Sequence, residues 1–186
     1  MSFSLAKYKR ACADYAANWE AVEIALYDLC KRHPDHQDQG GINAKLWIIG
    51  RAYATGIERK ISSQGFQGSS MTQLGKHFWR NRHRVDKALQ ILRGVNQPLT
   101  PEKLTKILDA HGRLVRIIQG ALRKGQTPRS FVSKYLHFHN PAVPISITLP
   151  LVKFLGLRDL RNLARDRNLP EGIRMGARKV LFEKRG

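Results

Sequence analysis

Apolar residues recur every three or four positions along most of the chain, which is the spacing of one face of an α-helix. The first such repeat covers residues 5–31 and predicts one helix whose apolar stripe faces the core. The stripe consists of Leu5, Tyr8, Cys12, Tyr15, Trp19, Val22, Leu26 and Leu29. The alternating pattern of a half-buried strand is scarce, so we expect an all-α fold.

Capping and helix-breaking residues divide the rest of the chain into further helices. His33-Pro34 ends the first helix, and Asn43 is the expected N-cap of a second helix that continues to Ile61. Thr100-Pro101 and Thr127-Pro128 each place a capping Thr before a Pro at the first helical position. Further helices are predicted over residues 72–92, 101–110, 114–124 and 128–137, after Thr148, and over 171–184.

A stretch rich in Gly and Ser, residues 62–70, separates two parts of different charge. We expect a near-neutral helical part over 1–61, a flexible connection, and a basic helical part over 71–186, packed as one compact helical unit. No apolar run approaches the roughly 20 residues that cross a bilayer, and the first ten residues do not resemble a secretory signal. A cytoplasmic protein is therefore expected, with Cys12 and Cys30 as buried free thiols.

Charge is the strongest signal in the composition. The 186 residues include 33 Lys and Arg and 14 Asp and Glu, a formal net charge of +19. Residues 61–186 hold twenty-four of the basic and seven of the acidic side chains. Such an excess favours a polyanionic partner, because Lys and Arg release condensed counterions when they neutralise phosphates. The alternatives are an anionic membrane, an acidic protein partner, or a basic surface that only aids solubility.

The predicted phosphate contacts are basic side chains of the second part. They are Lys76, Arg80, Arg82, Arg84, Arg123, Lys124, Arg129, Arg158, Arg161, Arg165, Arg178 and Lys179. Few acids are interleaved with them, which favours nucleic-acid contact over a plain solvated surface.

Residues 129–141 gather the densest set of chemically active side chains. Lys134, His137 and His139 lie within six residues, and Glu58 is the lone carboxylate between Asp38 and Asp86. Together they form a candidate catalytic set for acid-base chemistry on nucleic acid without a metal. The structural alternative makes Phe131, Tyr135 and Phe138 core residues and pairs Glu58 with Arg51 or Arg59. We expect no metal site and no cofactor, since two histidines two positions apart on a helix diverge.

The same segment resembles the core of the helix-hairpin-helix DNA glycosylase superfamily. Residues 130–136 (Ser-Phe-Val-Ser-Lys-Tyr-Leu) and 142–145 (Ala-Val-Pro-Ile) are similar to its Lys-x-Ala-Ser-x-Phe-Leu helix and the apolar-Pro-apolar-Asp segment that follows. In that family the Lys attacks the sugar and the Asp supports the positive charge that develops there. Here Ser130 stands at the Lys position, and Ser146, Ile147 or Thr148 stands at the Asp position.

The resemblance therefore implies a DNA-binding, glycosylase-like architecture without the family's catalytic pair. Loss of the carboxylate removes the main electrostatic support of an oxocarbenium-like transition state. Our leading hypothesis is an all-helical nucleic-acid-binding protein, with DNA as partner, that lacks standard glycosylase activity. The alternative is an active enzyme, a glycosylase, lyase or metal-independent nuclease, that uses Lys134, His137, His139 and Glu58. The sequence does not indicate an oligomeric state.

Overall fold

The computed structural model describes residues 5–53, 55–62 and 69–145. This part of the chain contains seven α-helices, one turn of 3₁₀-helix and no β-strand. In order, the elements are α1 (Leu5–Asn18), α2 (Glu20–Arg32), α3 (Gln39–Ala52), η1 (Glu58–Lys60), α4 (Ser70–Arg80), α5 (Arg82–Gln90), α6 (Pro101–Gln119) and α7 (Arg129–His139). The all-α prediction is confirmed for the described residues. None of their helices combines the length and the apolar character needed to span a membrane.

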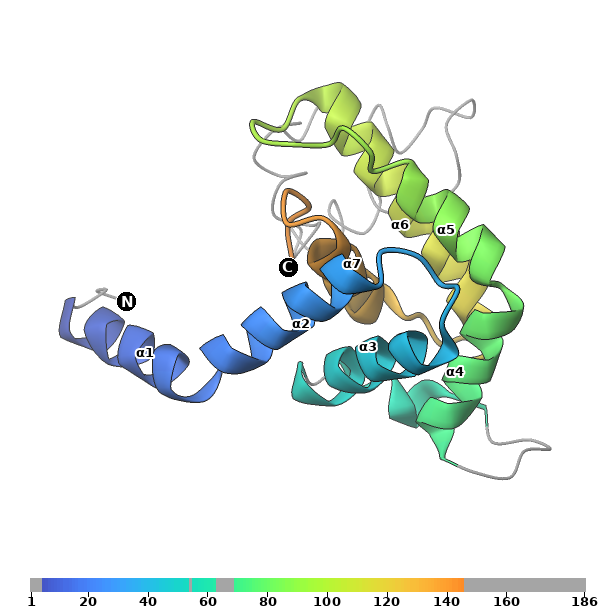
Figure 1. The fold of residues 1–186 in the computed structure, drawn as a ribbon, viewed down its shortest axis with the longest axis horizontal. Helices are drawn as coiled ribbons and strands as arrows, with labels where there is room; N and C mark the ends of the chain where they lie inside the picture. The colour runs from blue at the N-terminus through green and yellow to red at the C-terminus, as the bar shows by residue number, and fades with distance from the viewer. Residues whose placement is uncertain (1–4, 54, 63–68, 146–186) are drawn as a thin grey trace.

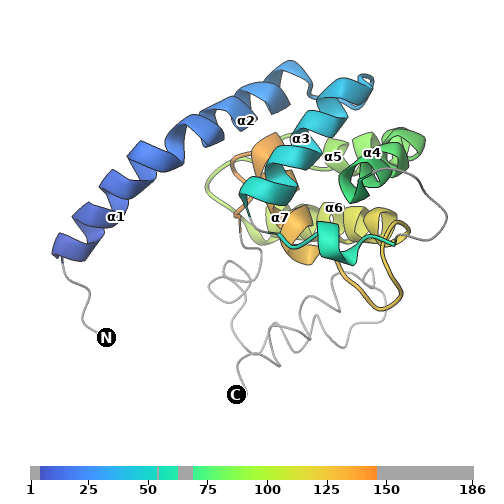
Figure 2. The same cartoon turned by 90° about the horizontal axis from the view of Figure 1, so that it is seen from below.

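Helices α2 to α7 form the body of the molecule, and α1 extends away from it as an arm (Figures 1 and 2). Helix α7 contacts α2, α3 and α6, so its side chains reach three sides of the body. Helices α4 and α5 follow one another along one edge, with α6 packed against α5. This arrangement places the α2–α3 connection, α5 and the end of α7 around a common centre.

The core is built from the inward faces of these helices. Phe131, Tyr135 and Phe138 are at most 2% exposed, which confirms that these aromatics are core residues. Apolar side chains from both sides of the 62–70 connection, such as Leu46 and Leu74, belong to the same buried cluster. Burial of this apolar surface is the main favourable term in folding.

The prediction for residues 5–31 is wrong in two respects. The backbone leaves the helical conformation at Trp19, with φ −122° and ψ −29°, and so divides the segment into α1 and α2. Cys12 and Tyr15 are exposed, although the apolar stripe was expected to face the core and Cys12 to be buried. Because α1 extends beyond the body, its apolar face has none of α3 to α7 lying along it (Figure 1). Cys30, near the C-terminal end of α2, is buried as expected.

Several helix boundaries also differ from expectation. The second helix does not continue to Ile61: α3 ends at Ala52, and residues 58–60 form the separate turn η1. Helix α3 begins at Gln39, not at Asn43, because the Asp38 carboxylate accepts hydrogen bonds from the Gly40 and Gly41 N–H groups at 3.0 and 2.7 Å. The predicted helix over 72–92 is interrupted at Asn81 and forms α4 and α5. The predicted break between 110 and 114 does not occur, and α6 runs through it.

The two Thr-Pro start signals have different outcomes. At α6 the Thr100 side chain accepts a hydrogen bond from the Lys103 N–H at 3.4 Å, and Pro101 occupies the first turn as predicted. At α7 the helix begins one residue later, at Arg129, and Pro128 takes the N-cap position without a side-chain cap. The capping role predicted for Thr100 is therefore confirmed, and that for Thr127 is wrong.

Two glycines allow α3 and α4 to approach closely. A Cβ on Gly50 would lie 2.8 Å from Met71 Cε, and a Cβ on Gly75 would overlap Asn43 Oδ1. Gly50 and Gly75 therefore both lie where the two helices approach each other.

Several predictions fall outside the described residues. Among them are most of the flexible connection, whose residues 63–68 are not described, the helix after Thr148 and the basic helix over 171–184. The division into a near-neutral part over 1–61 and a basic part over 71–186 stays a prediction.

Candidate functional site

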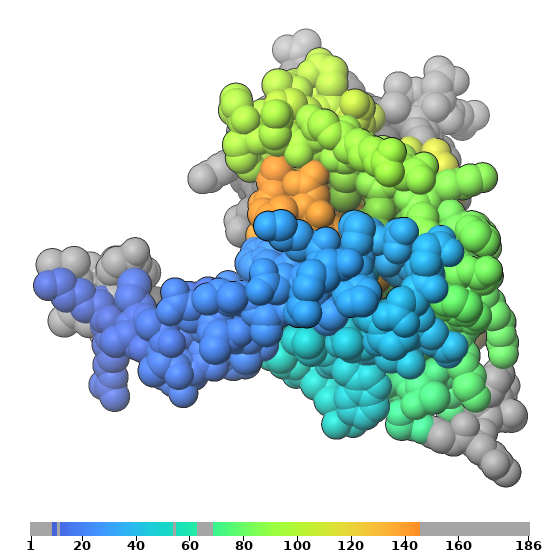
Figure 3. Space-filling view, viewed as in Figure 1, coloured from blue at the N-terminus to red at the C-terminus, as the bar shows by residue number. Residues whose placement is uncertain are grey.

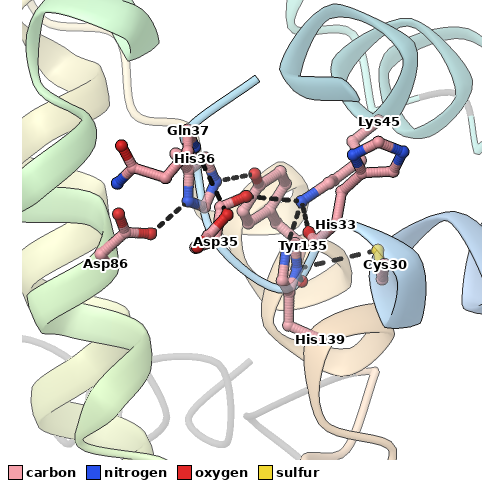
Figure 4. Close-up of polar contacts among 9 residues, drawn as sticks. All are labelled: Cys30, His33, Asp35, His36, Gln37, Lys45, Asp86, Tyr135 and His139. Atoms are coloured by element: carbon pink, nitrogen blue, oxygen red, sulfur yellow. Dashed lines mark hydrogen bonds and ion pairs between the residues drawn. The ribbon is translucent and has the colours of Figure 1, made fainter. Parts of the chain in front are cut away.

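A buried polar network joins four elements in the middle of the body (Figure 4). Its side chains come from the connection between α2 and α3, from α3, from α5 and from α7. Three of them, His36, Lys45 and Tyr135, are 0% exposed. Burying an ionisable group is costly unless protein hydrogen bonds replace those to water, so the partners of His36 and Lys45 decide what the network does.

His36 bridges α5 and α7 through its two ring nitrogens. Nδ1 lies 2.6 Å from Asp86 Oδ1, and Nε2 lies 2.5 Å from the Tyr135 hydroxyl. Burial lowers the pKa of His36, with the Asp86 hydrogen bond acting in the opposite direction, and burial raises the pKa of Tyr135. The imidazole is therefore neutral and the phenol protonated. It follows that His36 Nδ1–H donates to the carboxylate and the Tyr135 O–H donates to Nε2.

The Lys45 ammonium group donates to three acceptors. Two are the backbone carbonyls of His33 and Asp35, the latter at 3.5 Å, and the third is His139 Nε2 at 3.2 Å. An ammonium group has three N–H donors, so every one has an acceptor. Burial lowers the pKa of Lys45, an effect that nearby acidic groups offset in part. These bonds tie the connection between α2 and α3 to α3 and to the end of α7.

His139 completes the network at the C-terminal end of α7. Its Nδ1–H donates to the Tyr135 carbonyl at 2.9 Å, which leaves the Nε2 lone pair for Lys45. Burial lowers the pKa of His139 well below its usual value, and the Lys45 charge acts in the same direction. The Cys30 sulfur lies 3.9 Å from His139 Nδ1. Burial raises the pKa of the Cys30 thiol to about 11, so this thiol is protonated and unreactive at neutral pH.

A cleft of about 590 Å³ opens beside the network, between α5 and the connection that joins α2 to α3. In the space-filling view, orange atoms at and just beyond the end of α7 are visible between the yellow-green atoms that follow α5 and the blue end of α2 (Figure 3). The ionisable side chains that line the cleft, apart from Cys30, are Asp35, His83, Asp86, Lys87, Arg93 and His139. No three His, Cys, Asp or Glu side chains in the described ranges are placed to hold a metal ion.

Of the four predicted catalytic residues, only His139 belongs to this network. Lys134 faces the end of α3, where its Nζ donates to the Tyr53 carbonyl at 3.1 Å and to Ser130 Oγ at 3.3 Å. Burial lowers the pKa of Lys134. The bond to the Tyr53 carbonyl holds α7 against the C-terminal end of α3, and the bond to Ser130 lies within α7.

The other two predicted catalytic residues have partners of their own. His137 Nδ1–H donates to the Val143 carbonyl, and the Tyr27 hydroxyl donates to Nε2, both at 2.6 Å. Glu58 accepts a hydrogen bond from Arg51 Nε at 2.9 Å, so the structural pairing with Arg51 is confirmed. No hydrogen bond or ion pair joins any two of the four predicted catalytic residues, all of which lie in the described ranges.

The predicted phosphate contacts divide into three groups. Lys76, Arg80, Arg84, Arg123 and Lys124 are exposed, whereas Arg82 and Arg129 are half-buried. Arg82 lies over the Trp79 ring, 4.5 Å from its centroid, and donates to the Trp79 carbonyl at 3.1 Å. The remaining five, Arg158, Arg161, Arg165, Arg178 and Lys179, are outside the described residues.

Sequence reasoning did not find His36, Lys45 and Asp86 as a group. One signal was present: Lys45 falls on the apolar face of its helix, three residues after Ile42 and four before Ile49. A charged residue at a core position needs buried partners. One of the Lys45 partners, His139, lies 94 positions away along the chain, and spacing alone does not reveal such a contact.

No family model, no curated protein and no solved structure matches this chain.

Proposed function

We propose that this protein binds nucleic acid, with duplex DNA as the ligand, through cations along α4 and α5. We call Lys76, Arg80, Arg84 and Lys87 the basic edge. All four side chains are exposed. Lys76 and Arg80 are four residues apart on α4, and Arg84 and Lys87 are three apart on α5, so each pair shares a helix face. The two helices follow one another along one edge of the body (Figure 1).

The observation that carries this proposal is the excess of cations over carboxylates in the segment that contains the basic edge. Residues 69–145 contain fourteen Lys and Arg side chains but three Asp and Glu side chains. Asp86 binds His36, Asp109 pairs with Arg113 at 3.0 Å, and Glu102 lies in the first turn of α6, where it offsets the helix dipole.

No ion pair within the described ranges includes Lys76, Arg84 or Lys87. Exposed cations without carboxylate partners can neutralise phosphates directly, and the counterions released from the nucleic acid then favour binding. The helical backbone of α4 and α5 is already ordered, so no loop has to be ordered at these positions on binding.

The helix-hairpin-helix resemblance supports DNA as the nucleic acid and a glycosylase-like architecture. Ser130, at the position of the family's Lys, is exposed at the start of α7 and accepts a hydrogen bond from Lys134. The position of the family's Asp falls on residues 146–148, outside the described residues. The proposal is therefore DNA binding without standard base excision.

Fluorescence anisotropy with a labelled duplex of random sequence tests this function. About six phosphate contacts predict a loss of affinity of roughly a thousandfold between about 50 and 200 mM NaCl. The double variant Lys76→Gln/Arg84→Gln is expected to bind more weakly and to reduce the slope of log K against log salt concentration by about 2.

The matched control is Lys9→Gln/Arg32→Gln, which removes the same charge from exposed positions on α1 and α2. It is expected to keep the parent slope. Equal effects of the two double variants would reject the basic edge as the binding surface. An affinity that barely changes with salt would reject the function itself.

A further inference from the structure

The cleft beside the buried network has the size of a small-molecule site and walls that the network holds in place. Its volume of about 590 Å³ lies within the range of roughly 300 to 1,000 Å³ that is usual for ligand pockets. Lys45 fixes the connection that forms one wall, through the carbonyls of His33 and Asp35. The side chains of His36 and Asp86 join that connection to α5, the opposite wall. Walls fixed in this way need little reorganisation when a ligand binds.

One side of the cleft suits a phosphate group. Lys87 and Arg93 are exposed cations on α5 and in the turn after it, and His83 lies one turn before Lys87. No hydrogen bond or ion pair in the described ranges engages the side chain of any of these three residues. Arg and Lys side chains are the usual phosphate partners in proteins.

Two carboxylates in the same cleft show that a bare anion would not be an adequate ligand. Asp86 Oδ1 is occupied by His36, but its Oδ2 makes no hydrogen bond within the described ranges. The Asp35 carboxylate also lines the cleft, is exposed and accepts a hydrogen bond from the Gln37 N–H at 3.4 Å. Ionised carboxylates only accept hydrogen bonds, so they would repel a phosphate yet bind hydroxyl or amino groups on the same ligand.

Apolar lining completes the description of the ligand. Pro34, Leu89 and Leu92 contribute to the cleft alongside the charged groups, and a flat ring can pack against such side chains. The ligand that suits these walls carries a phosphate, hydrogen-bond donors and an apolar ring.

We propose that the cleft binds a nucleoside monophosphate unit, either as a free nucleotide or at the end of a nucleic-acid strand. Lys87 and Arg93 bind the phosphate, and the carboxylates of Asp86 and Asp35 accept hydrogen bonds from the sugar or base. The inference rests on the cleft itself and does not require DNA binding by the basic edge.

Isothermal titration calorimetry of the full chain tests this inference with the 5′-monophosphates of adenosine, guanosine, cytidine and uridine, and with inorganic pyrophosphate. We expect saturable binding of at least one nucleotide at one site per chain. Asp86→Asn is the decisive variant, because it removes a negative charge and still allows the side-chain oxygen to accept the hydrogen bond from His36. It is expected to weaken nucleotide binding about tenfold and to leave pyrophosphate binding unchanged or tighter.

Two further variants separate the cleft from the basic edge. Lys87→Gln/Arg93→Gln is expected to weaken the binding of nucleotide and pyrophosphate alike, whereas Lys76→Gln/Arg84→Gln, outside the cleft lining, is expected to leave both nearly unchanged. Far-ultraviolet circular dichroism verifies the fold of each variant. If Asp86→Asn does not fold, Asp35→Asn, at an exposed position, takes its place with the same expectation.

The outcomes are distinct. If Asp86→Asn tightens the binding of nucleotide and of pyrophosphate alike, the proposal is overturned, and the cleft is a simple cation cluster. The absence of saturable binding up to about 10 mM nucleotide would also overturn it. To identify the source, a duplex with a 5′-phosphorylated overhang is compared with the blunt duplex. If the protein prefers the overhang duplex and Asp86→Asn abolishes that preference, the cleft binds strand ends. If the protein binds nucleotides but shows no preference for the overhang duplex, the cleft binds free nucleotides.

Discussion

Lys45 keeps three hydrogen bonds at a position where an apolar side chain would otherwise be expected. Its acceptors include His139 Nε2, which can accept only while that imidazole is neutral. His36, stacked on His139 with ring centroids 5.8 Å apart, also uses its Nε2 as an acceptor. The network is therefore consistent with a charged Lys45 beside two neutral histidines. Protonation of either histidine would remove an acceptor and bring a second positive charge close to the ammonium group.

This arrangement predicts that stability falls on mild acidification. Burial lowers the pKa of both His36 and His139, with the Lys45 charge contributing to each shift. Below about pH 6.5 the unfolded chain takes up protons on these histidines, whereas the folded chain does not, so the free energy of unfolding decreases as pH falls. We expect a slope of up to about 1.4 kcal/mol per pH unit for each histidine between about pH 6.5 and 5, measured by urea unfolding.

The matched variants compare buried with exposed histidine. His36→Gln/His139→Gln is expected to be less stable at neutral pH but to show a flatter dependence on pH, since the two groups no longer titrate. His83→Gln, at an exposed position, is expected to keep the parent slope. The same slope in all three proteins would show that other groups govern acid sensitivity.

Among the helices, one point of the α3–α4 contact places a glycine against an amide side chain. Gly75 on α4 leaves room for the Asn43 side chain of α3, and the buried Asn43 Oδ1 has no hydrogen-bond partner. Gly75→Ala is expected to lower the free energy of unfolding by about 1 to 3 kcal/mol, because its Cβ would overlap Asn43 Oδ1. Chemical denaturation of the single variant measures this loss.

Removing the amide should reverse the sign of that effect. In the Asn43→Ala background the added Cβ has space, and Ala is favoured over Gly inside a helix by about 1 kcal/mol. The double variant is therefore expected to be at least as stable as Asn43→Ala alone. A double-mutant cycle in which the two substitutions are additive would show that Asn43 moves aside at little cost.

Sequence periodicity predicted that these helices exist more successfully than it predicted the residues at which they begin and end. Apolar spacing and the Thr100-Pro101 start identified α6, but not its continuation through residues 110–114. In the structure Gly112 is buried within α6 and does not interrupt it. The break at Asn81 was also missed. It is marked by a hydrogen bond that the Asn81 side chain donates to the His77 carbonyl at 3.0 Å, where α4 ends. Such choices depend on packing and local hydrogen bonds, which apolar spacing does not contain.

At the scale of the whole molecule, the formal charge of +19 has two opposite consequences for the effect of salt. Self-repulsion destabilises the folded state, and screening becomes strong near 0.1 M salt, where the Debye length is about 10 Å. Raising NaCl from about 20 to 200 mM is therefore expected to raise the melting temperature of the free protein by about 2 to 4 °C. The same change weakens nucleic-acid binding.

The control for this prediction is Lys76→Gln/Arg84→Gln, which carries two fewer charges. Its melting temperature is expected to rise less with salt, because there is less repulsion to screen. A melting temperature that falls with added salt would show that attractive ion pairs outweigh the net repulsion.

The candidate site was predictable only in part. His139 was identified because histidines, a lysine and aromatic residues cluster in residues 129–141, and that local density is visible in the sequence. His137 and Lys134 shared the same signal, yet on α7 they point toward Tyr27 and Tyr53 respectively. Neighbouring positions on a helix face different directions, so closeness along the chain does not imply a common site.

The all-α character and the excess of cations followed from the sequence alone, and core roles for Phe131, Tyr135 and Phe138 were one of the alternatives that it left open. Periodicity, composition and charge are local or additive properties, and they survive whatever arrangement the helices take. The tertiary structure decided that Lys45, His36, Asp86 and His139 form one network, and that the apolar stripe of α1 extends past the body. Both depend on which helices lie beside one another, and contacts between residues a hundred positions apart are set by the packing of the whole chain.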